Sequence, residues 1–404
     1  MKHKNLIPIA LFACLTFGSC GTHKQVEKPL VQIINSSLDS AIEQSLRMAK
    51  SLKDSPKRLP KSLLKGGKLE TSNSAWWTSG FFPGVLWQLY EYSGTDSLKY
   101  WAENYTDRVK NQQYTTDNHD VGFMIYSSFG NAWRITKDEK YKKVIHTASE
   151  SLSTRFSKTT GCIRSWNTAS WNKQWQYPVI IDNMMNLEML MWSSKNCNEQ
   201  KFSDIAVSHA NTTMKNHYRK DYSCYHVVSY DTITGNVQSR NTAQGYSDES
   251  AWARGQAWGL YGYTMMYRET KQESYLNEAI QIARFILHHP NLPKDKIPYW
   301  DFDAPNIPNA LRDASAGAVI CSALIELSQY VDKSLAKEYL AVAEKQIRVL
   351  SSPEYFAKIG ENGNFILKHS VGHFPNQTEI DVPLSYADYY YLEALMRYKK
   401  LKQL

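Results

Sequence analysis

Segments of helical length alternate in character along almost the whole chain, and this alternation constrains the fold more than any other feature. Two of them, 273–289 and 334–350, carry a charged face, which suits a helix exposed on one side. Others, such as 250–269 and 312–330, are apolar or small nearly all round, which suits a helix buried on every side. About twelve helices are expected, near residues 28–53, 80–93, 97–113, 121–136, 138–155, 180–195, 200–217, 250–269, 273–289, 312–330, 334–350 and 384–400. Six outer–inner pairs predict an all-α protein, an (α/α)6 barrel.

The loops before the expected inner helices are polar or aromatic. They read SAWWTSG, TTDNHDV, WQYPVIID, AQGYSDES, NALRDAS and EIDVPLS. If the inner helices run parallel, these loops converge on one mouth of the barrel and can form a cleft there. Short β segments are expected only in the loops, and the segment YHVVSYDTITG, around 225–235, is the one that has the pattern of a strand and turn.

The N-terminus has the pattern of a secretion signal. Basic residues precede an apolar run from Leu6 to Phe17, and small residues then lead to Cys20. The segment FGSC resembles a bacterial lipoprotein cleavage site, although Phe17 stands where Leu is usual. We therefore expect a signal over residues 1–20 with cleavage before Cys20, lipidation of Cys20, a tether over 21–27 and one catalytic domain over 28–404. This predicts an exported bacterial protein, periplasmic or anchored to the outer membrane; the alternative is an ordinary cleaved signal with Cys20 incidental.

Composition excludes several classes of function. The four cysteines after the signal lack any CxxC spacing, so neither a zinc site nor a disulfide scaffold is predicted, and we expect no metal or cofactor. The formal net charge is +8, but Lys and Arg are spread along the chain and no nucleic-acid motif is present. For an exported protein, an acidic carbohydrate is the more plausible anionic partner, and any membrane contact is expected only through the lipid anchor.

One carboxylate, Asp182, stands near the start of the otherwise apolar run VIIDNMMNLEMLMW. It can be a helix cap, since Asp is a preferred N-cap residue. Alternatively, a carboxyl among apolar groups has a raised pKa and can donate a proton near neutral pH. Asp120, in NHDVGF, precedes another inner helix, and a carboxylate pair that faces a sugar is the usual equipment of a glycosidase. Further candidate acids are Asp248, Glu249, Asp313 and Asp381.

Aromatic residues favour a sugar-binding cleft, although each alone is more often a core residue. In AWARGQAW, Trp252, Arg254 and Trp258 share roughly one helical face. A guanidinium between two indole rings is well placed to bind a substrate carboxylate through two hydrogen bonds. An internal salt bridge is the alternative for this arginine. The tryptophans in or beside the loops are Trp76, Trp77, Trp166, Trp171, Trp175, Trp252 and Trp258.

Four motifs in the same order, NHDVGF, IIDNMMNLEMLMW, WARGQAWGLYGY and ADYYYLEALMR, resemble the unsaturated glucuronyl hydrolases of glycoside hydrolase family 88. The resemblance extends from about Trp76 to Arg397. It implies an (α/α)6 barrel that removes the 4,5-unsaturated uronic acid from the non-reducing end of oligosaccharides made by polysaccharide lyases. The implied chemistry is hydration of the C4=C5 vinyl ether, not displacement at the anomeric carbon.

The resemblance also implies roles for individual residues. Asp182 matches the general acid and base, and Asp120 matches a second essential acid that would keep Asp182 protonated and orient the substrate. One of Trp76 and Trp77 is expected to line the pocket. The other implied substrate contacts are His119, His226, Gln244, Trp252, Arg254 and Trp258.

Two other functions are compatible with the sequence. One is the related family 105 of unsaturated rhamnogalacturonyl hydrolases, which have the same barrel and chemistry but act on pectin fragments; NHDVGF and the Trp-Arg-Trp helix favour the glucuronyl class. The other is a non-catalytic glycan-binding lipoprotein, which would keep the aromatic cleft but need no paired acids. The loop LKHSVGHFPNQTEIDVPLSYADYY shows no sulfate-binding signature that we can identify, so the sulfation of the substrate stays open, as does the oligomeric state.

Overall fold

Helices occupy all twelve segments in which the sequence predicts them. The structure is a computed structural model that describes residue 1 and residues 28–404, so the expected signal, Cys20 and the tether lie outside the described residues, apart from Met1. The α-helices are α1 (Leu30–Ser51), α2 (Phe81–Ser93), α3 (Asp96–Val109), α4 (Asn131–Thr136), α5 (Glu139–Ser153), α6 (Leu187–Cys197), α7 (Gln200–His217), α8 (Ala253–Thr270), α9 (Glu273–His288), α10 (Ala314–Leu327), α11 (Lys333–Leu350) and α12 (Ser385–Lys402). Shorter helical turns are η1 (Lys110–Tyr114), η2 (Gly122–Gly130), η3 (Ile181–Asn186) and η4 (Asn362–Asn364).

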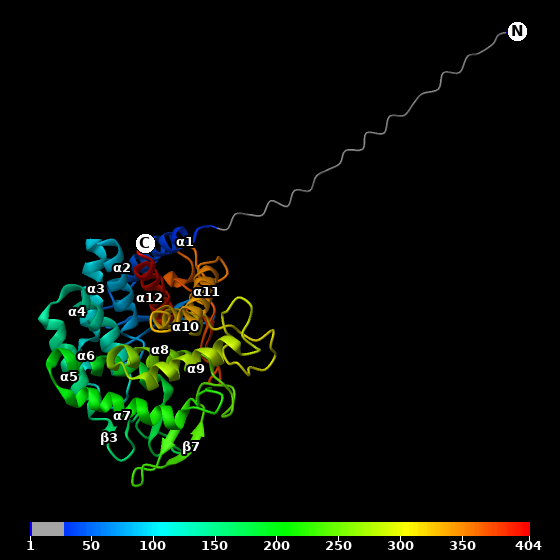
Figure 1. Cartoon of the computed structure of the whole chain (residues 1–404). Helices are drawn as coiled ribbons and strands as arrows, with labels where there is room; N and C mark the ends of the chain where they lie inside the picture. The colour runs from blue at the N-terminus through cyan, green and yellow to red at the C-terminus, as the bar shows by residue number, and fades with distance from the viewer. Residues whose placement is uncertain (2–27) are drawn as a thin grey trace.

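The inner helices close into a ring. In ring order they are α2, η2 with α4, η3 with α6, α8, α10 and α12, and α12 packs back against α2. The outer helices α3, α5, α7, α9 and α11 pack against their inner neighbours, and α1 packs against α2, α11 and α12 (Figure 1). The predicted (α/α)6 barrel is confirmed.

The burial of each helix follows its composition. Every residue of α10 is buried, as its apolar and small sequence predicts for an inner helix. The outer helix α11 buries one face, which includes Tyr339 and Ile347, and leaves its Lys and Glu side chains toward solvent. Asp332 caps α11 by accepting hydrogen bonds from the backbone N–H groups of Ser334 and Leu335, so its start is fixed by a local signal.

The loops contain more strands than the sequence predicts. The predicted strand is β6 (Val227–Tyr230), which lies between β5 (Pro178–Ile180) and β7 (Val237–Asn241) in an antiparallel sheet. The remaining strands form three antiparallel hairpins: β1 (Leu59–Leu63) with β2 (Leu69–Ser72), β3 (Phe156–Ser157) with β4 (Cys162–Ile163), and β8 (Ser370–His373) with β9 (Thr378–Val382). All of these strands lie in connections that lead into an inner helix, so they build up one end of the barrel.

The inner segment after Asp120 is not a regular α-helix. Residues Gly122–Gly130 form a π-helix, η2, before α4 continues the segment. At its start a Cβ on Gly122 would lie 2.6 Å from Asn186 Oδ1 and 2.7 Å from Asn186 Cα, so only glycine allows η2 to approach η3 this closely. Asn186 Oδ1 accepts a hydrogen bond of 2.9 Å from the backbone N–H of Phe123. This contact brings the start of η2 and the residues of η3 side by side.

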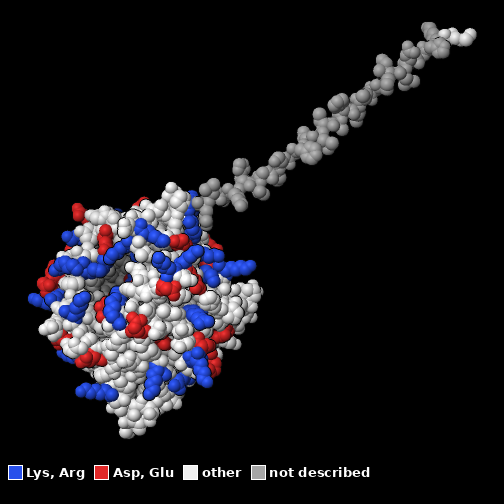
Figure 2. Space-filling view, viewed as in Figure 1, with Lys and Arg blue, Asp and Glu red and all other residues white. Residues whose placement is uncertain are grey.

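The opposite end of the barrel, where the inner helices finish, holds a network of ion pairs. Arg268 pairs with Glu188 at 2.5 Å and with Glu326 at 2.9 Å, and Arg397 pairs with Glu326 at 2.8 Å. Glu188, Arg268 and Arg397 line a cavity of about 780 Å³. Elsewhere on the surface, Lys and Arg are interspersed with Asp and Glu on the face that Figure 2 shows. Within the described part of the chain, no helix has both the length and the hydropathy to cross a membrane.

Candidate active site

A pocket of about 790 Å³ opens at the end of the barrel built by the loops and hairpins. Five of the six loops that the sequence singles out contribute side chains to it, which supports the predicted convergence on one mouth; NALRDAS is the exception. The lining residues are Lys61, Ala75, Trp76, Trp77, Asn118, His119, Asp120, Trp166, Trp171, Trp175, Ile180, Asp182, Ala243, Gln244, His373, Asn376, Thr378 and Glu379.

Asp182 lies in η3, the short turn that leads into α6, and its side chain faces this pocket. No side chain caps η3, and Asp182 Oδ2 is buried without a hydrogen-bond partner among the described residues. The helix-cap interpretation is therefore wrong. Burial raises the pKa of Asp182 to about 7, although the charge of Arg254 acts in the opposite direction.

Asp120 is the second carboxyl in the pocket. Burial, and after it the negative charge of Asp182, raises the pKa of Asp120 to about 8, while Arg155 lowers it. The two carboxyls are thus coupled, and the pair retains a proton at neutral pH. The family resemblance implied that Asp182 holds the proton and that the neighbouring Asp120 keeps Asp182 protonated. In the structure the pKa of both carboxyls is raised, and burial is the largest cause at each of them.

Two neutral histidines stand beside the acids. His119 Nε2 lies 3.4 Å from Asp120 Oδ1, and complete burial lowers the pKa of His119 to about 3. His226 Nδ1 accepts hydrogen bonds from the backbone N–H groups of Ala243 (3.0 Å) and Gln244 (3.1 Å). The proton of the neutral ring must then be on Nε2, which lies 3.6 Å from Asp182 Oδ2. His226 therefore presents a donor to Asp182 from behind the pocket wall.

Arg254 is an internal residue and not a side chain of the pocket wall, so its predicted position is wrong. It is 1 % exposed, and its Nη1 lies 3.1 Å from Asp313 Oδ2. Nη1 also donates to the carbonyl of Val371 at 2.5 Å, and Nη2 donates to that of Gly372 at 2.6 Å. Because these bonds engage both terminal nitrogens, the bidentate grip expected from them is not available. The internal salt bridge, which the sequence left as the alternative, is present.

Trp252, the residue before α8, and Trp258, on the inner helix α8, are also buried and do not line the pocket. The Trp252 ring lies 4.6 Å from the His226 ring, and the Arg254 guanidinium lies 4.6 Å from the Trp252 ring. Trp252 therefore packs against His226 behind the pocket wall, and Arg254 holds β8 in place through the carbonyls of Val371 and Gly372. Trp258 packs elsewhere, with its ring 5.4 Å from that of Phe123.

Both tryptophans of SAWWTSG line the pocket, although the sequence predicts only one. Trp76 is 39 % exposed and lies at the rim, with the Lys61 ammonium 4.6 Å from its ring. Trp77 lies deeper, with its ring 5.4 Å from that of Phe123 and 4.9 Å from that of Tyr386. Gln244 also lines the pocket as expected, and its Nε2 donates to the carbonyl of Gly372 at 3.1 Å.

Trp166, Trp171 and Trp175, which the sequence places among the loop tryptophans, line the pocket and form an aromatic cluster with ring separations of 5.1 to 6.2 Å. No role was assigned from the sequence to several other lining residues. Lys61 comes from β1 and Glu379 from β9, and no spacing in the sequence connects these two hairpins. Asn118, His373, Asn376 and Thr378 also line the pocket; they lie in loops whose sequences are quoted above, but they were not among the predicted candidates.

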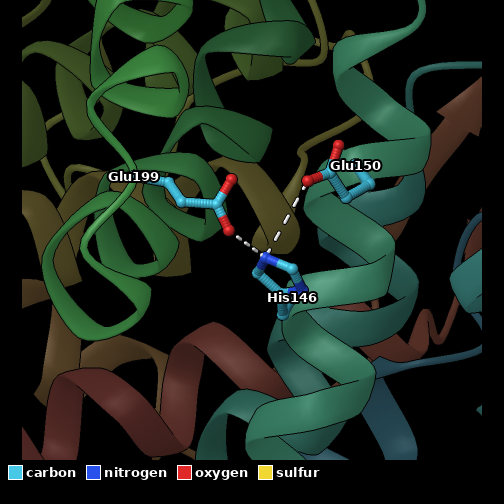
Figure 3. A group of neighbouring side chains, drawn as sticks. All are labelled: His146, Glu150 and Glu199. Atoms are coloured by element: carbon cyan, nitrogen blue, oxygen red, sulfur yellow. Dashed lines mark hydrogen bonds and ion pairs between the residues drawn. The ribbon is translucent and has the colours of Figure 1, made fainter.

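A separate group of metal-ligating residue types lies outside the pocket, although the sequence predicts no metal site. Figure 3 shows His146 and Glu150 of α5 beside Glu199, with both carboxylates turned toward the imidazole. The Lys201 ammonium lies 2.5 Å from Glu150 and 2.8 Å from Glu199. Lys201 thus already supplies the positive charge that a metal ion would bring, and we interpret the group as an ion-pair cluster.

Comparison with known proteins identifies the family. The profile of Glycosyl Hydrolase Family 88 matches residues 47–402. An unsaturated glucuronyl hydrolase of Formosa agariphila is 47 % identical over 327 residues, 80 % of each chain. An unsaturated chondroitin disaccharide hydrolase of Streptococcus pyogenes is 32 % identical over 378 residues, 91 % of each chain. A crystal structure of an unsaturated glucuronyl hydrolase specific for heparin superimposes with a TM-score of 0.89 at 50 % identity, over 92 % of this chain and 98 % of that one. This chain therefore belongs to Glycosyl Hydrolase Family 88 and is a glycosidase.

Proposed function

We propose that this protein is an unsaturated glucuronyl hydrolase. It removes the 4,5-unsaturated uronic acid from the non-reducing end of oligosaccharides that polysaccharide lyases produce. The observation that carries the proposal is a pair of carboxyls with raised pKa values, the buried Asp182 and the partly exposed Asp120, on one aromatic pocket in a family 88 chain. A glycan-binding protein would need the aromatic rings but not these acids, whose burial costs stability in the ionised form.

In the proposed reaction, Asp182 gives its proton to C4 of the unsaturated sugar. The electrons of the C4=C5 double bond form the new C4–H bond, which leaves positive charge at C5 shared with the ring oxygen. Water then adds to C5 and returns one proton to the Asp182 carboxylate, so the acid is restored. The resulting hemiketal opens by cleavage of the bond between C5 and the ring oxygen. C1 is then a hemiacetal, which collapses to an aldehyde and releases the neighbouring sugar as an alcohol.

The surrounding residues suit these steps. Asp120 is coupled to Asp182, and its carboxyl can orient the sugar hydroxyls in the pocket. The Nε2–H of His226, 3.6 Å from Asp182 Oδ2, stabilises the carboxylate that appears when the proton leaves. His119 is neutral and buried beside Asp120 and can donate a hydrogen bond without adding a charge. Trp76 and Trp77 offer aromatic faces to the sugar rings.

The substrate class that we propose is an unsaturated disaccharide derived from a glycosaminoglycan. The relatives named for glucuronyl and chondroitin disaccharides, and the solved structure described as specific for heparin, support it. The match to family 88 also favours this class over the rhamnogalacturonyl hydrolases of family 105.

A panel of lyase-generated disaccharides tests the proposal. Unsaturated products from chondroitin, hyaluronan, heparin and rhamnogalacturonan are each incubated with the full chain, and loss of absorbance by the conjugated double bond is followed. Turnover of the glycosaminoglycan products, with the Asp182→Asn variant inactive, is the expected result. Binding without turnover would favour the glycan-binding alternative, and turnover of the rhamnogalacturonan product alone would favour the family 105 activity.

We further propose that the protein is an exported lipoprotein, anchored through Cys20 and facing the periplasm or the outside. Support comes from the sequence, in which an apolar run ends at GSC within FGSC. The lipid would tether a domain that begins near residue 28.

A further inference from the structure

Arg155, just after the end of α5, places a buried guanidinium between two loops of the pocket. The residue is 8 % exposed. Its Nε donates to the carbonyl of Arg164 at 2.8 Å, and its Nη1 donates to the carbonyl of Thr116 at 2.5 Å and to Asn167 Oδ1 at 3.1 Å. Thr116 lies in the loop that carries Asp120, whereas Arg164 and Asn167 lie in the loop of the aromatic cluster. One side chain therefore clasps both loops.

The two loops also meet through their backbones, directly beside Asp120. The backbone N–H of His119 donates to the carbonyl of Ser165 at 3.1 Å, and Asn118 pairs with Trp166 in an antiparallel bridge. Asp120 is the next residue of its loop, so the position of its carboxyl relative to the aromatic cluster depends on this junction. The clasp lies only a few residues away in each loop and therefore holds the junction in place.

The positive charge of Arg155 is not neutralised by direct contact. Its hydrogen bonds go to neutral oxygens, and Nη2 is buried without a hydrogen-bond partner among the described residues. Burial of a charge without an ion-pair partner is costly, so a neutral side chain would suit a purely structural position better. Arg254, another buried arginine near the acids, differs because its Nη1 is paired with Asp313 at 3.1 Å. The titratable groups that act on Arg155 are Arg164, Tyr177, Asp117 and Asp120.

Arg155 differs in sign from the other charged groups around Asp120. Burial is the largest cause of the raised pKa of Asp120, and the charges of Asp182 in η3 and of Asp117 in the same loop raise it further, whereas Arg155 lowers it. His119, with Nε2 3.4 Å from Asp120 Oδ1, is neutral because burial lowers its pKa to about 3. Removal of the Arg155 charge should therefore raise the pKa of Asp120. Because the two acids are coupled, the pair should then keep its last proton to a higher pH.

We infer that Arg155 is a positioning residue, which clasps the loop of His119 and Asp120 in place and supplies a positive charge that stabilises the acid pair when it loses its proton. The inference rests on the proposed function. When Asp182 gives its proton to C4, the pair gains a negative charge in a partly desolvated pocket, where charges interact strongly. A fixed cation nearby lowers the energy of that state. Arg155 does not line the pocket, so it acts through Asp120 and not on the sugar.

Two substitutions at Arg155 separate its charge from its hydrogen bonds. Arg155→Met removes both, whereas Arg155→Lys keeps the charge but lacks the planar fork that reaches two loops. The kcat and kcat/KM for an unsaturated chondroitin disaccharide are measured across the pH range in which the acid pair titrates. Both variants should lower kcat by roughly tenfold or more. Arg155→Met should also move the alkaline fall of kcat/KM to higher pH by about half a unit or more, whereas Arg155→Lys should leave the fall at the pH of the wild type.

The pH of the alkaline fall is the decisive readout, because a merely structural role would lower activity at every pH without moving it. An unmoved fall in a folded Arg155→Met protein overturns the inference and leaves the proposed function intact. If circular dichroism shows that Arg155→Met does not fold, a wild-type kcat in Arg155→Lys still overturns the inference. Arg47→Met, at an exposed position on α1, is the matched control and should follow the wild type in both quantities. A wild-type protein without activity on any lyase-generated disaccharide overturns the proposed function, and the inference with it.

Discussion

Replacing Asp182 by Asn should abolish turnover while making the protein more stable at neutral and higher pH. The amide keeps nearly the same shape, but it cannot give a proton to C4 or take one from water. The turnover number should therefore fall by at least the roughly 100-fold to 10,000-fold that general acid–base catalysis contributes. Substrate binding should survive, because the aromatic walls and the neighbouring histidines are unchanged.

The gain in stability follows from the pKa of this carboxyl. Asp182 has an ordinary pKa of 3.8 and a folded-state pKa of about 7, so the unfolded chain loses this proton at lower pH than the folded protein does. Because the pKa of Asp182 is higher in the folded protein than in the unfolded chain, the protonated carboxyl contributes its full stability below the unfolded-state pKa. This contribution is lost as the pH rises through the folded-state pKa. Between these two pKa values the free energy of unfolding falls by about 1.4 kcal/mol per pH unit. From about pH 5 to about pH 7, the free energy of unfolding of the wild type should therefore fall by roughly 2 to 3 kcal/mol relative to that of the Asp182→Asn variant.

The assay combines kinetics with denaturant unfolding at several pH values. The free energy of unfolding of the wild type and of Asp182→Asn is measured in urea, and Asp107→Asn, at an exposed position on α3, is the matched control. The control should follow the wild type at every pH. An active, folded Asp182→Asn protein would refute the catalytic role, and parallel pH–stability curves would refute the raised pKa.

Four further results are expected. The kcat/KM for an unsaturated disaccharide should fall as pH rises above about 7 to 8, where the acid pair loses its proton, and a flat profile would contradict this. Arg254→Ala should lower the free energy of unfolding by about 3 to 5 kcal/mol, measured in urea, because Asp313 is left buried without its partner; unchanged stability would argue against it. Trp166→Ala should raise KM more than it lowers kcat, as steady-state kinetics can show. Cys20→Ser should move the protein from the membrane to the soluble fraction, and equal partition of both forms would exclude lipidation.

The barrel could be predicted from the sequence because inner and outer helices have different surroundings. An inner helix such as α10 contacts protein on all sides, so its residues are apolar or small nearly all round. An outer helix such as α11 contacts protein on one side only, so its other side is polar. The hairpins were missed because strands of two to five residues are too short to show an alternating pattern. The π-helix was missed because a nine-residue apolar run has too few polar residues to reveal its period.

The site residues that could be predicted are those whose side chains are unusual for their place in the sequence. Asp120 and Asp182 stand out as acids beside apolar runs, and the family resemblance gave them a role. Arg254 was misplaced because helical spacing shows which residues share a face but not which elements cover that face. The partners of Lys61 and Glu379 depend on the packing of β1 against β9, hairpins more than 300 residues apart in the chain, and no local pattern records that contact.

The π-helix η2 also limits which changes in chain length the protein can tolerate. A π-helix closes its hydrogen bonds one residue further along than an α-helix, so deletion of a single residue within Gly122–Gly130 would let the segment revert to ordinary pitch. Because an α-helix turns about 100° per residue, the deletion would rotate Asp120 relative to the rest of the inner helix and move its side chain away from the pocket. The amino-acid composition would hardly change. Natural variants should therefore gain or lose residues in the outer connections and keep the number of residues between Asp120 and α4 fixed.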